Sequence, residues 1–168
     1  MCILIYKPKG VEMPSKYILD KASLANPHGF GFVSSNHKLY KTMSYERFMQ
    51  ELAKVDDSEN CIIHFRLATH GSICRRNCHP FKQRDVFFAH NGILRIQPIN
   101  DMTDSETAFK TLLYPAVAKF GLYSDEVNDA VNSIIGYSKF AMMQNDNVRL
   151  FGSFSRIKGS YYSNLRFL

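Results

Sequence analysis

Residues 1–7 read MCILIYK, and this short stretch decides where the fold begins. Apolar side chains occupy residues 3–6, which favours a buried β-strand directly behind the first two residues. Cys2 therefore stands at the start of that predicted strand. If Met1 is removed, Cys2 carries both a thiol and a free α-amino group, whose ordinary pKa of about 8 suits a general base near neutral pH. A nucleophile and its base would then share one residue.

Further strands are predicted along the first half of the chain. Residues 29–35 and 38–41 form a predicted hairpin that turns at Asn36-His37, and residues 61–65 and 86–90 are short and apolar enough for buried strands. Asn91-Gly92 then follows, which is the residue pair most typical of a two-residue hairpin turn. The sequence therefore predicts a return strand over Ile93–Ile96.

The second half of the chain is mainly helical until it returns to strands. Ser44 is a predicted cap for an earlier helix, and Asp104 or Ser105 for a long one that ends at Gly121. A further helix is predicted over 124–134, and strands over 138–143, 148–151 and 160–163. Strand pairs before and after a block of helices indicate an α+β fold rather than a doubly wound parallel sheet.

Composition places the chain among single-domain globular proteins. With 168 residues and 45% hydrophobic content it can bury one sizeable core, and we expect one domain over 1–168. No apolar run approaches the roughly 20 residues of a membrane span. We therefore expect a cytoplasmic protein with no membrane partner.

The distribution of charge argues against a nucleic-acid-binding protein, and the cysteine content argues against a secreted, disulfide-rich scaffold. The formal net charge of +6 would attract acidic partners, but the basic residues are scattered, which favours a solvated surface over a nucleic-acid-binding face. Four cysteines without other signs of a secreted scaffold are expected to be reduced thiols. A zinc site at His70, Cys74, Cys78 and His79 is an alternative, but structural zinc usually takes two separated ligand pairs. We expect no metal and no cofactor.

Six motifs occur in the order of a known family. They are Met1-Cys2-Ile3, Asn26-Pro27-His28-Gly29-Phe30-Gly31, the block from His64 to Gly71, Asn77-Cys78-His79-Pro80-Phe81, His90-Asn91-Gly92-Ile93-Leu94 and Thr103-Asp104-Ser105-Glu106. In this the sequence resembles the class II glutamine amidotransferases, which are N-terminal nucleophile hydrolases. The resemblance implies a four-layer αββα sandwich. One departure is His28, which stands where many single-domain members carry an acidic residue.

The resemblance also implies an activity and a set of site residues. Members hydrolyse the side-chain amide of glutamine through a thioester on an N-terminal cysteine, here Cys2, and pass the ammonia to a synthetase. Asn91 and Gly92 match the oxyanion-binding positions, and Arg66 and Asp104 match those that hold the carboxylate and the ammonium group of glutamine. Thr69 and His70 match positions lining the same pocket. The ammonia acceptor is expected to be a separate synthetase subunit.

Two alternatives to this activity remain open at the level of sequence. The same pocket could hold the γ-glutamyl half of a conjugate, which would make the protein a γ-glutamyl amidase. Alternatively, the fold could serve as a non-catalytic binding module, whose binding through the basic surface would weaken steeply with salt. Retained Met1 would favour the second alternative, because the α-amine of Cys2 would then be locked in a peptide bond.

Overall fold

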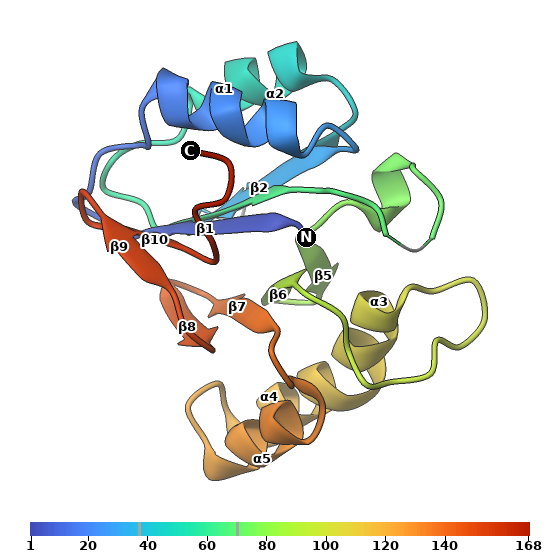
Figure 1. Ribbon diagram of the computed structural model, residues 1–168. Coiled ribbons are helices and arrows are strands. Elements are labelled where there is room, and N and C mark those ends of the chain that lie inside the picture. The colour runs from blue at the N-terminus through green and yellow to red at the C-terminus, as the bar shows by residue number, and fades with distance from the viewer. Residues whose placement is uncertain (37, 70) are drawn as a thin grey trace.

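The computed structural model describes residues 1–36, 38–69 and 71–168 and arranges them in four layers (Figure 1). Helices α1 and α2 cover one face of a six-stranded antiparallel sheet, whose other face packs on a four-stranded antiparallel sheet. The remaining helices cover the outer face of the second sheet. The predicted α+β architecture, a four-layer αββα sandwich, is confirmed.

The first sheet has the strand order β3-β2-β4-β1-β10-β9 and the second the order β5-β6-β7-β8. The strands are β1 (Ile3–Lys7), β2 (Phe30–Ser34), β3 (Leu39–Thr42), β4 (Cys61–Phe65), β5 (Phe81–Gln83), β6 (Val86–Asn91), β7 (Lys139–Gln144), β8 (Asn147–Phe151), β9 (Ser155–Ile157) and β10 (Ser160–Tyr162). The helical segments are α1 (Lys16–Ala25), α2 (Tyr45–Leu52), the 3₁₀ turn η1 (Arg75–Asn77), α3 (Asp104–Ala108), the π-helical η2 (Phe109–Leu113), α4 (Tyr114–Phe120) and α5 (Asp125–Ile134).

Alternation along β1 shows how the layers form. Ile3 and Ile5 pack in the core under α1 and α2, whereas Leu4 points into the core between the two sheets. This is the two-residue period of a strand that is buried on both faces. The first stretch of sequence therefore lies at the centre of the molecule, and its first residues emerge at one end of the sheet.

Strand register brings distant residues to that end of the sheet. Ile3 lies opposite Phe65 in the antiparallel pair β1–β4, which places Cys2 beside Arg66. On the other side of β1, Ile5 lies opposite Tyr162, which places Ser163 beside Leu4. In Figure 1 the N-terminus lies near the middle of the view, with α3 below it and to its right.

The predicted return strand after the Asn91-Gly92 turn is wrong. Ile93–Ile96 forms no strand, because β6 is already paired with β5 on one side and β7 on the other. Asn91 lies opposite Lys139, a residue far along the chain. The Asn-Gly pair is a local turn signal, whereas the pairing of β6 with the distant strand β7 determines that no return strand forms. The chain after Gly92 instead leads to α3.

The capping of α3 also differs from the prediction. Its N-cap is Thr103, whose hydroxyl oxygen accepts a hydrogen bond from the Glu106 N–H at 3.2 Å. Asp104 is the first helical residue, where a carboxylate interacts favourably with the helix dipole. The predicted caps Ser44 and Gly121 are confirmed.

Four elements have no counterpart in the sequence prediction, namely α1, the short turn η1, β5 and β9. Helix α1 has no side-chain N-cap, so it lacks one of the usual start signals. Strands β5 and β9 have only three residues each, too few for an alternating pattern. The predicted turn at Asn36-His37 includes His37, which lies outside the described residues.

Candidate functional site

Cys2 lies at the mouth of the site, one residue before β1. Its thiol donates a hydrogen bond to the Leu67 carbonyl oxygen at a donor–acceptor distance of 3.6 Å. Burial raises the pKa of this thiol, and the charge of Arg66 only partly offsets that effect. The thiol is therefore protonated at neutral pH, and a reaction at its sulfur needs a proton acceptor close by.

Two asparagine side chains hold the backbone around Cys2. Asn26 Nδ2 donates to the carbonyl oxygen of Met1 at 2.9 Å, and Asn164 Nδ2 donates to that of Cys2 at 2.9 Å. Met1 is 48% exposed. The first residue thus lies at the surface, while the second is fixed from the far end of the chain.

Arg66 lies beside Cys2 at one end of the first sheet. It follows β4, is only 4% exposed, and donates through Nη1 to the Ser72 carbonyl oxygen at 2.9 Å. This bond holds the loop at Ser72 to the end of β4, an interior strand of the first sheet. Thr69 lines the same cavity as Cys2, whereas the predicted pocket residue His70 lies outside the described residues.

Asn91 ends β6 and is 1% exposed. Its Nδ2 donates to the hydroxyl oxygen of Ser163 at 2.9 Å. Gly92 follows with φ of +140°, and a Cβ atom there would lie 2.2 Å from the Ser138 hydroxyl oxygen. Only glycine fits this close approach. The Asn91 amide and the Gly92 backbone are thus held at the end of β6, as two donors for a developing negative charge would need to be.

Asp104 reaches the site from the start of α3. One carboxylate oxygen accepts from the Leu94 N–H at 3.0 Å, and the other accepts from the Ser105 N–H at 2.7 Å. Ser105 in turn forms a hydrogen bond at 2.8 Å with Nδ1 of His90. The carboxylate is therefore held rigidly, and a carboxylate that accepts from these backbone groups can still accept from a bound ammonium group.

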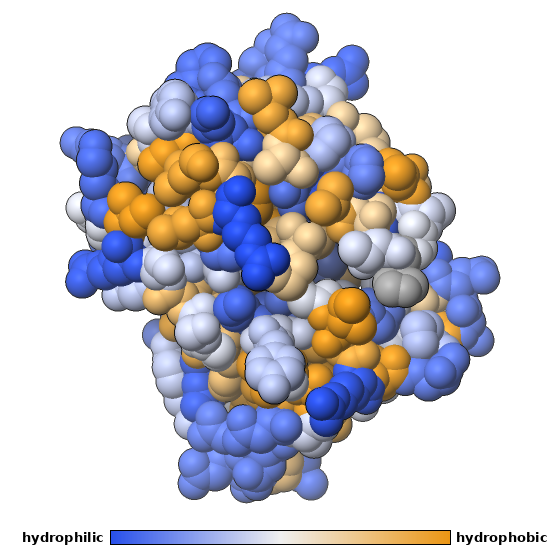
Figure 2. Space-filling view, viewed as in Figure 1, coloured by the Kyte–Doolittle hydropathy of each residue, from blue (hydrophilic) through white to orange (hydrophobic). Residues whose placement is uncertain are grey.

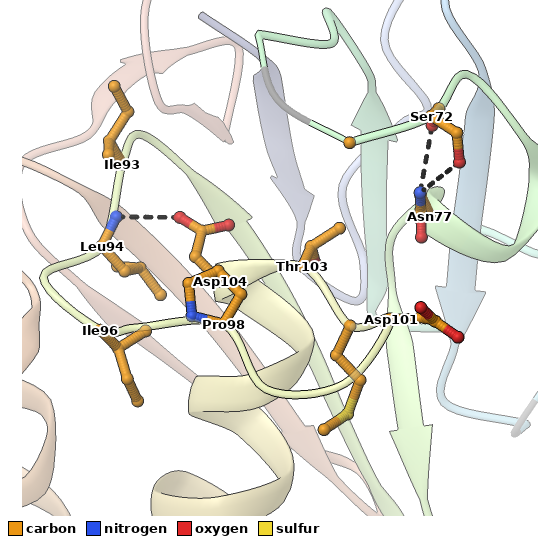
Figure 3. A pocket seen from close by; sticks show the side chains of 11 residues that line it. Ser72, Asn77, Ile93, Leu94, Ile96, Pro98, Asp101, Thr103 and Asp104 are labelled. Carbon is orange, nitrogen blue, oxygen red and sulfur yellow. Dashed lines mark hydrogen bonds between the residues drawn. The ribbon is translucent and has the colours of Figure 1, made fainter.

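Two adjoining cavities connect these residues. The smaller, of about 50 Å³, is lined by Cys2, Arg66, Thr69, Gly92 and Asp104 together with Leu67, Ala68, Asn77, His79, His90, Ile93, Thr103 and Ser105. The larger, of about 300 Å³, shares Asn77, Ile93, Thr103 and Asp104 with it. Figure 3 shows this larger cavity, with Ile93, Leu94, Ile96 and Pro98 on one side and Ser72, Asn77 and Asp101 on the other.

The structure therefore brings together six of the seven predicted site residues. Cys2, Arg66, Thr69, Gly92 and Asp104 line one cavity, and Asn91 stands directly before Gly92. Sequence reasoning missed Ser163 and Asn164, which bond to Asn91 and Cys2. No local pattern marks them, because they reach the site only through the pairing of β10 with β1.

Three buried histidines lie at the site: His79 and His90 line the smaller cavity, and His64 contacts both of them. The His64 and His79 ring centroids are 4.4 Å apart, and His64 Nε2 forms a 3.0 Å hydrogen bond with the His90 carbonyl oxygen. Burial lowers the pKa of His64 to about 3 and that of His90 to about 4, and it lowers the pKa of His79 well below its ordinary value. All three are therefore neutral at physiological pH.

Stability should fall in mild acid because of these histidines. Their pKa values are lower in the folded protein than the value of about 6.5 in an unfolded chain, so below pH 6.5 the unfolded state binds the extra protons. Each histidine then removes about 1.4 kcal/mol of unfolding free energy per pH unit. Urea unfolding should show a loss of about 3 to 4 kcal/mol between pH 6 and pH 5, and His79→Phe should reduce that slope by about a third. A free energy of unfolding that does not change between pH 6 and pH 5 would contradict the burial of these histidines in their neutral form.

No metal site emerges from the described residues, among which no group of three or more histidine, cysteine, aspartate or glutamate side chains is placed to hold an ion. The alternative zinc site included His70, which lies outside them. Likewise, no helix in the described ranges is long and apolar enough to cross a membrane.

A separate hollow of about 330 Å³ lies away from the site, between the loop before α1 and the β9–β10 hairpin. Figure 2 shows hydrophobic residues gathered on the left of this face, where Figure 1 places α1 and β9. The hollow is lined by Gly10, Val11, Glu12, Met13, Pro14, Ser15, Ile18, Ile157, Lys158, Gly159, Ser160 and Tyr162. None of these lining residues is a cysteine or histidine.

Comparisons with known proteins agree with this geometry. The model of a family described as "Glutamine amidotransferases class-II" matches residues 41–151, which is more than half of the chain. Among solved structures, the "structure of the allosteric regulatory enzyme of purine biosynthesis" is similar in fold, with a TM-score of 0.59 and 17% sequence identity. The likeness covers 96% of this chain and 41% of that one. No curated protein matches the sequence.

Proposed function

Because the chain belongs to the class-II glutamine amidotransferases, we propose that it hydrolyses the side-chain amide of glutamine through a thioester on Cys2. One observation carries the proposal: strand register sets a thiol beside a guanidinium, and the start of α3 adds a carboxylate to the same cavity, beside the Asn91-Gly92 turn. The matched range begins at residue 41, so the role of Cys2 rests on its position in this cavity.

In the proposed reaction the α-amine of Cys2 accepts the thiol proton once Met1 has been removed. The thiolate attacks the amide carbon of glutamine, and the resulting oxyanion accepts hydrogen bonds from the Asn91 side chain and the Gly92 N–H. The carbon–nitrogen bond then breaks, the protonated amine returns its proton to the leaving nitrogen, and ammonia departs. Water attacks the thioester in the same way, which releases glutamate and restores the thiol.

Recognition of free glutamine is assigned to two charged side chains and to the residues around them. Arg66 would bind the α-carboxylate and Asp104 the α-ammonium group, with Thr69 and His70 completing the pocket. Support comes from Arg66 and Asp104 lining the same cavity as Cys2. We propose that the ammonia passes to a separate synthetase subunit in the cytoplasm.

Arg66→Lys should weaken glutamine binding more than it slows the chemical step. A guanidinium can form two parallel hydrogen bonds with a carboxylate, whereas an ammonium group cannot. Loss of one charge-assisted bond should raise KM for glutamine by about 10- to 100-fold, with a smaller change in kcat. Steady-state kinetics would measure this. Arg156→Lys, at an exposed position in β9, is the matched control, and an unchanged KM in Arg66→Lys would contradict the assignment.

The larger cavity favours a second candidate substrate, a γ-glutamyl conjugate. It adjoins the smaller cavity through Asn77, Ile93, Thr103 and Asp104, and it offers an apolar wall of Ile93, Leu94, Ile96 and Pro98. A substrate larger than glutamine could extend into this space. Glutamine alone would leave the apolar wall in contact with water.

One experiment separates these candidates. Intact mass spectrometry of the natively expressed protein would first test Met1 removal and then labelling by a glutamine-mimicking electrophile. Turnover of glutamine would next be compared with that of γ-glutamyl anilides. Loss of Met1, a single adduct on Cys2 and faster glutamine turnover are expected. Faster turnover of the anilides would favour the amidase, and retained Met1 without an adduct would leave a binding module.

A further inference from the structure

Two side chains from the last residues of the chain contact the groups to which the proposed reaction is assigned. The Ser163 hydroxyl oxygen accepts hydrogen bonds from the Leu4 N–H and from Asn91 Nδ2, both at 2.9 Å. The next residue, Asn164, donates to the carbonyl oxygen of Cys2. Ser163 is 4% exposed. The segment thus bonds to the nucleophile strand, to the nucleophile residue and to the oxyanion side chain.

We propose that Ser163 is a positioning residue that sets the orientation of the Asn91 amide for oxyanion binding, with Asn164 fixing the backbone of Cys2. The proposal rests on the function proposed above. Ser163 occupies one of the two Nδ2 hydrogens of Asn91, which leaves the other hydrogen for the oxyanion. No second partner of Nδ2 is found in the described part of the chain.

The orientation of an asparagine amide needs such an external bond. The torsion between the sp³ and sp² carbons of this side chain is broad, so the amide alone does not select which of its ends faces the substrate. Asn91 is almost fully buried, and its Oδ1 has no hydrogen-bond partner within the described residues. Among the described residues, the bond to Ser163 is therefore the contact that holds the amide with Nδ2 toward this hydroxyl. An amide turned the other way would present Oδ1 to the oxyanion, which is repulsive.

The same bond joins the two sheets. Ser163 continues from β10 beside Leu4 in the first sheet, since its N–H also donates to the Leu4 carbonyl oxygen at 2.9 Å. Asn91 ends β6 in the second sheet. The hydroxyl therefore links the strand of the nucleophile to the strand of the oxyanion donor, and it fixes the separation between the attacking sulfur and that donor.

The hydrogen bond from Asn164 to the backbone of Cys2 remains after Met1 is removed. Asn26 bonds to the carbonyl oxygen of Met1, and this bond is lost when Met1 leaves. The carbonyl oxygen that Asn164 holds belongs to Cys2 itself and remains. The position of the new N-terminal residue therefore continues to be fixed from the end of the chain.

Ser163→Ala tests the inference in the purified full-length protein. We expect kcat for glutamine to fall by about 10- to 100-fold, less than for complete loss of an oxyanion donor, with KM within about two-fold of the wild-type value because Ser163 makes no proposed substrate contact. Alkylation of Cys2 by a haloacetamide forms no oxyanion, so its rate should not change. Ser163→Thr keeps the hydroxyl and should restore most of kcat.

A matched control comes from the same sheet. The Ser35 hydroxyl oxygen accepts from the Asn60 N–H at 2.7 Å, away from the site, so Ser35→Ala should lose a similar bond and keep kcat. A kcat of Ser163→Ala equal to that of wild type would overturn the inference. An equal loss of glutamine turnover and haloacetamide reactivity would overturn it as well, because it would indicate general disruption of the fold.

A readout that is independent of turnover separates this inference from the proposed function. In an NMR spectrum of protein labelled with ¹⁵N-asparagine, the Asn91 side-chain NH₂ signals would be assigned from their absence in Asn91→Ala. Ser163→Ala should shift and broaden them. Unchanged signals would overturn the inference whatever the activity, whereas shifted signals in a protein without any glutamine turnover would retain the positioning bond and reject the proposed function.

Discussion

Cys2→Ala is expected to abolish ammonia release from glutamine while the protein remains folded. The proposed thioester forms on the sulfur of this residue. After removal of Met1, Cys2 is the residue in the cavity that carries both a thiol as nucleophile and a free α-amine as base, so no other lining residue can replace it. Because Cys2 is only partly buried and precedes β1, the substitution leaves the cores intact. Ammonia release would be measured with purified wild-type and variant protein, and thermal unfolding would check the fold.

Cys74→Ala is the matched control for this prediction. Hydrogen bonds from the Ser72 hydroxyl and from backbone N–H groups lower the pKa of the Cys74 thiol, whereas burial raises that of Cys2. A general alkylating reagent should therefore also label Cys74, and only the glutamine mimic should select Cys2. Cys74→Ala should keep full turnover. Activity retained in Cys2→Ala would reject both the amidotransferase and the amidase assignments.

Asn91→Ala is expected to lower kcat by about 10²- to 10³-fold with little change in KM. Removal of one prearranged oxyanion donor typically costs about 3 to 4 kcal/mol of transition-state stabilisation, and the donor contacts the substrate oxygen most strongly when that oxygen becomes negative. Asn91→Asp should be at least as slow, because a carboxylate would repel the oxyanion. Steady-state kinetics with glutamine would measure both variants.

Asn60→Ala is the matched control for Asn91→Ala. The Asn60 side chain is also buried, but it accepts from the Tyr6 hydroxyl and donates to Asp146, outside the site. Asn60→Ala should therefore lower the unfolding free energy and leave kcat of the folded protein near its wild-type value. If Asn91→Ala behaved in the same way, its role would be structural and the oxyanion assignment would be wrong.

The sequence alone predicted much of the architecture because the relevant signals are local. Alternating or continuous apolar runs predicted the strands that became β1, β4, β6 and β7. The predicted cap Ser44 begins a helix in the structure, and α5 lies within the predicted range 124–134. Capping bonds and strand periodicity act over a few residues, so they can be read without a partner. The candidate nucleophile and the charged residues were found through six ordered motifs, of which none is specific by itself.

Only the tertiary structure decided which segments meet. Asn91-Gly92 carries a strong hairpin signal, yet β7 pairs with β6 and prevents the return strand. Ser163 stands 72 residues from Asn91, and Asn164 stands 162 residues from Cys2. These contacts depend on strand order and on the burial of whole layers, which no short window of sequence contains. The candidate site residues are therefore marked by local motifs, whereas long-range packing of the two sheets brings them to one cavity.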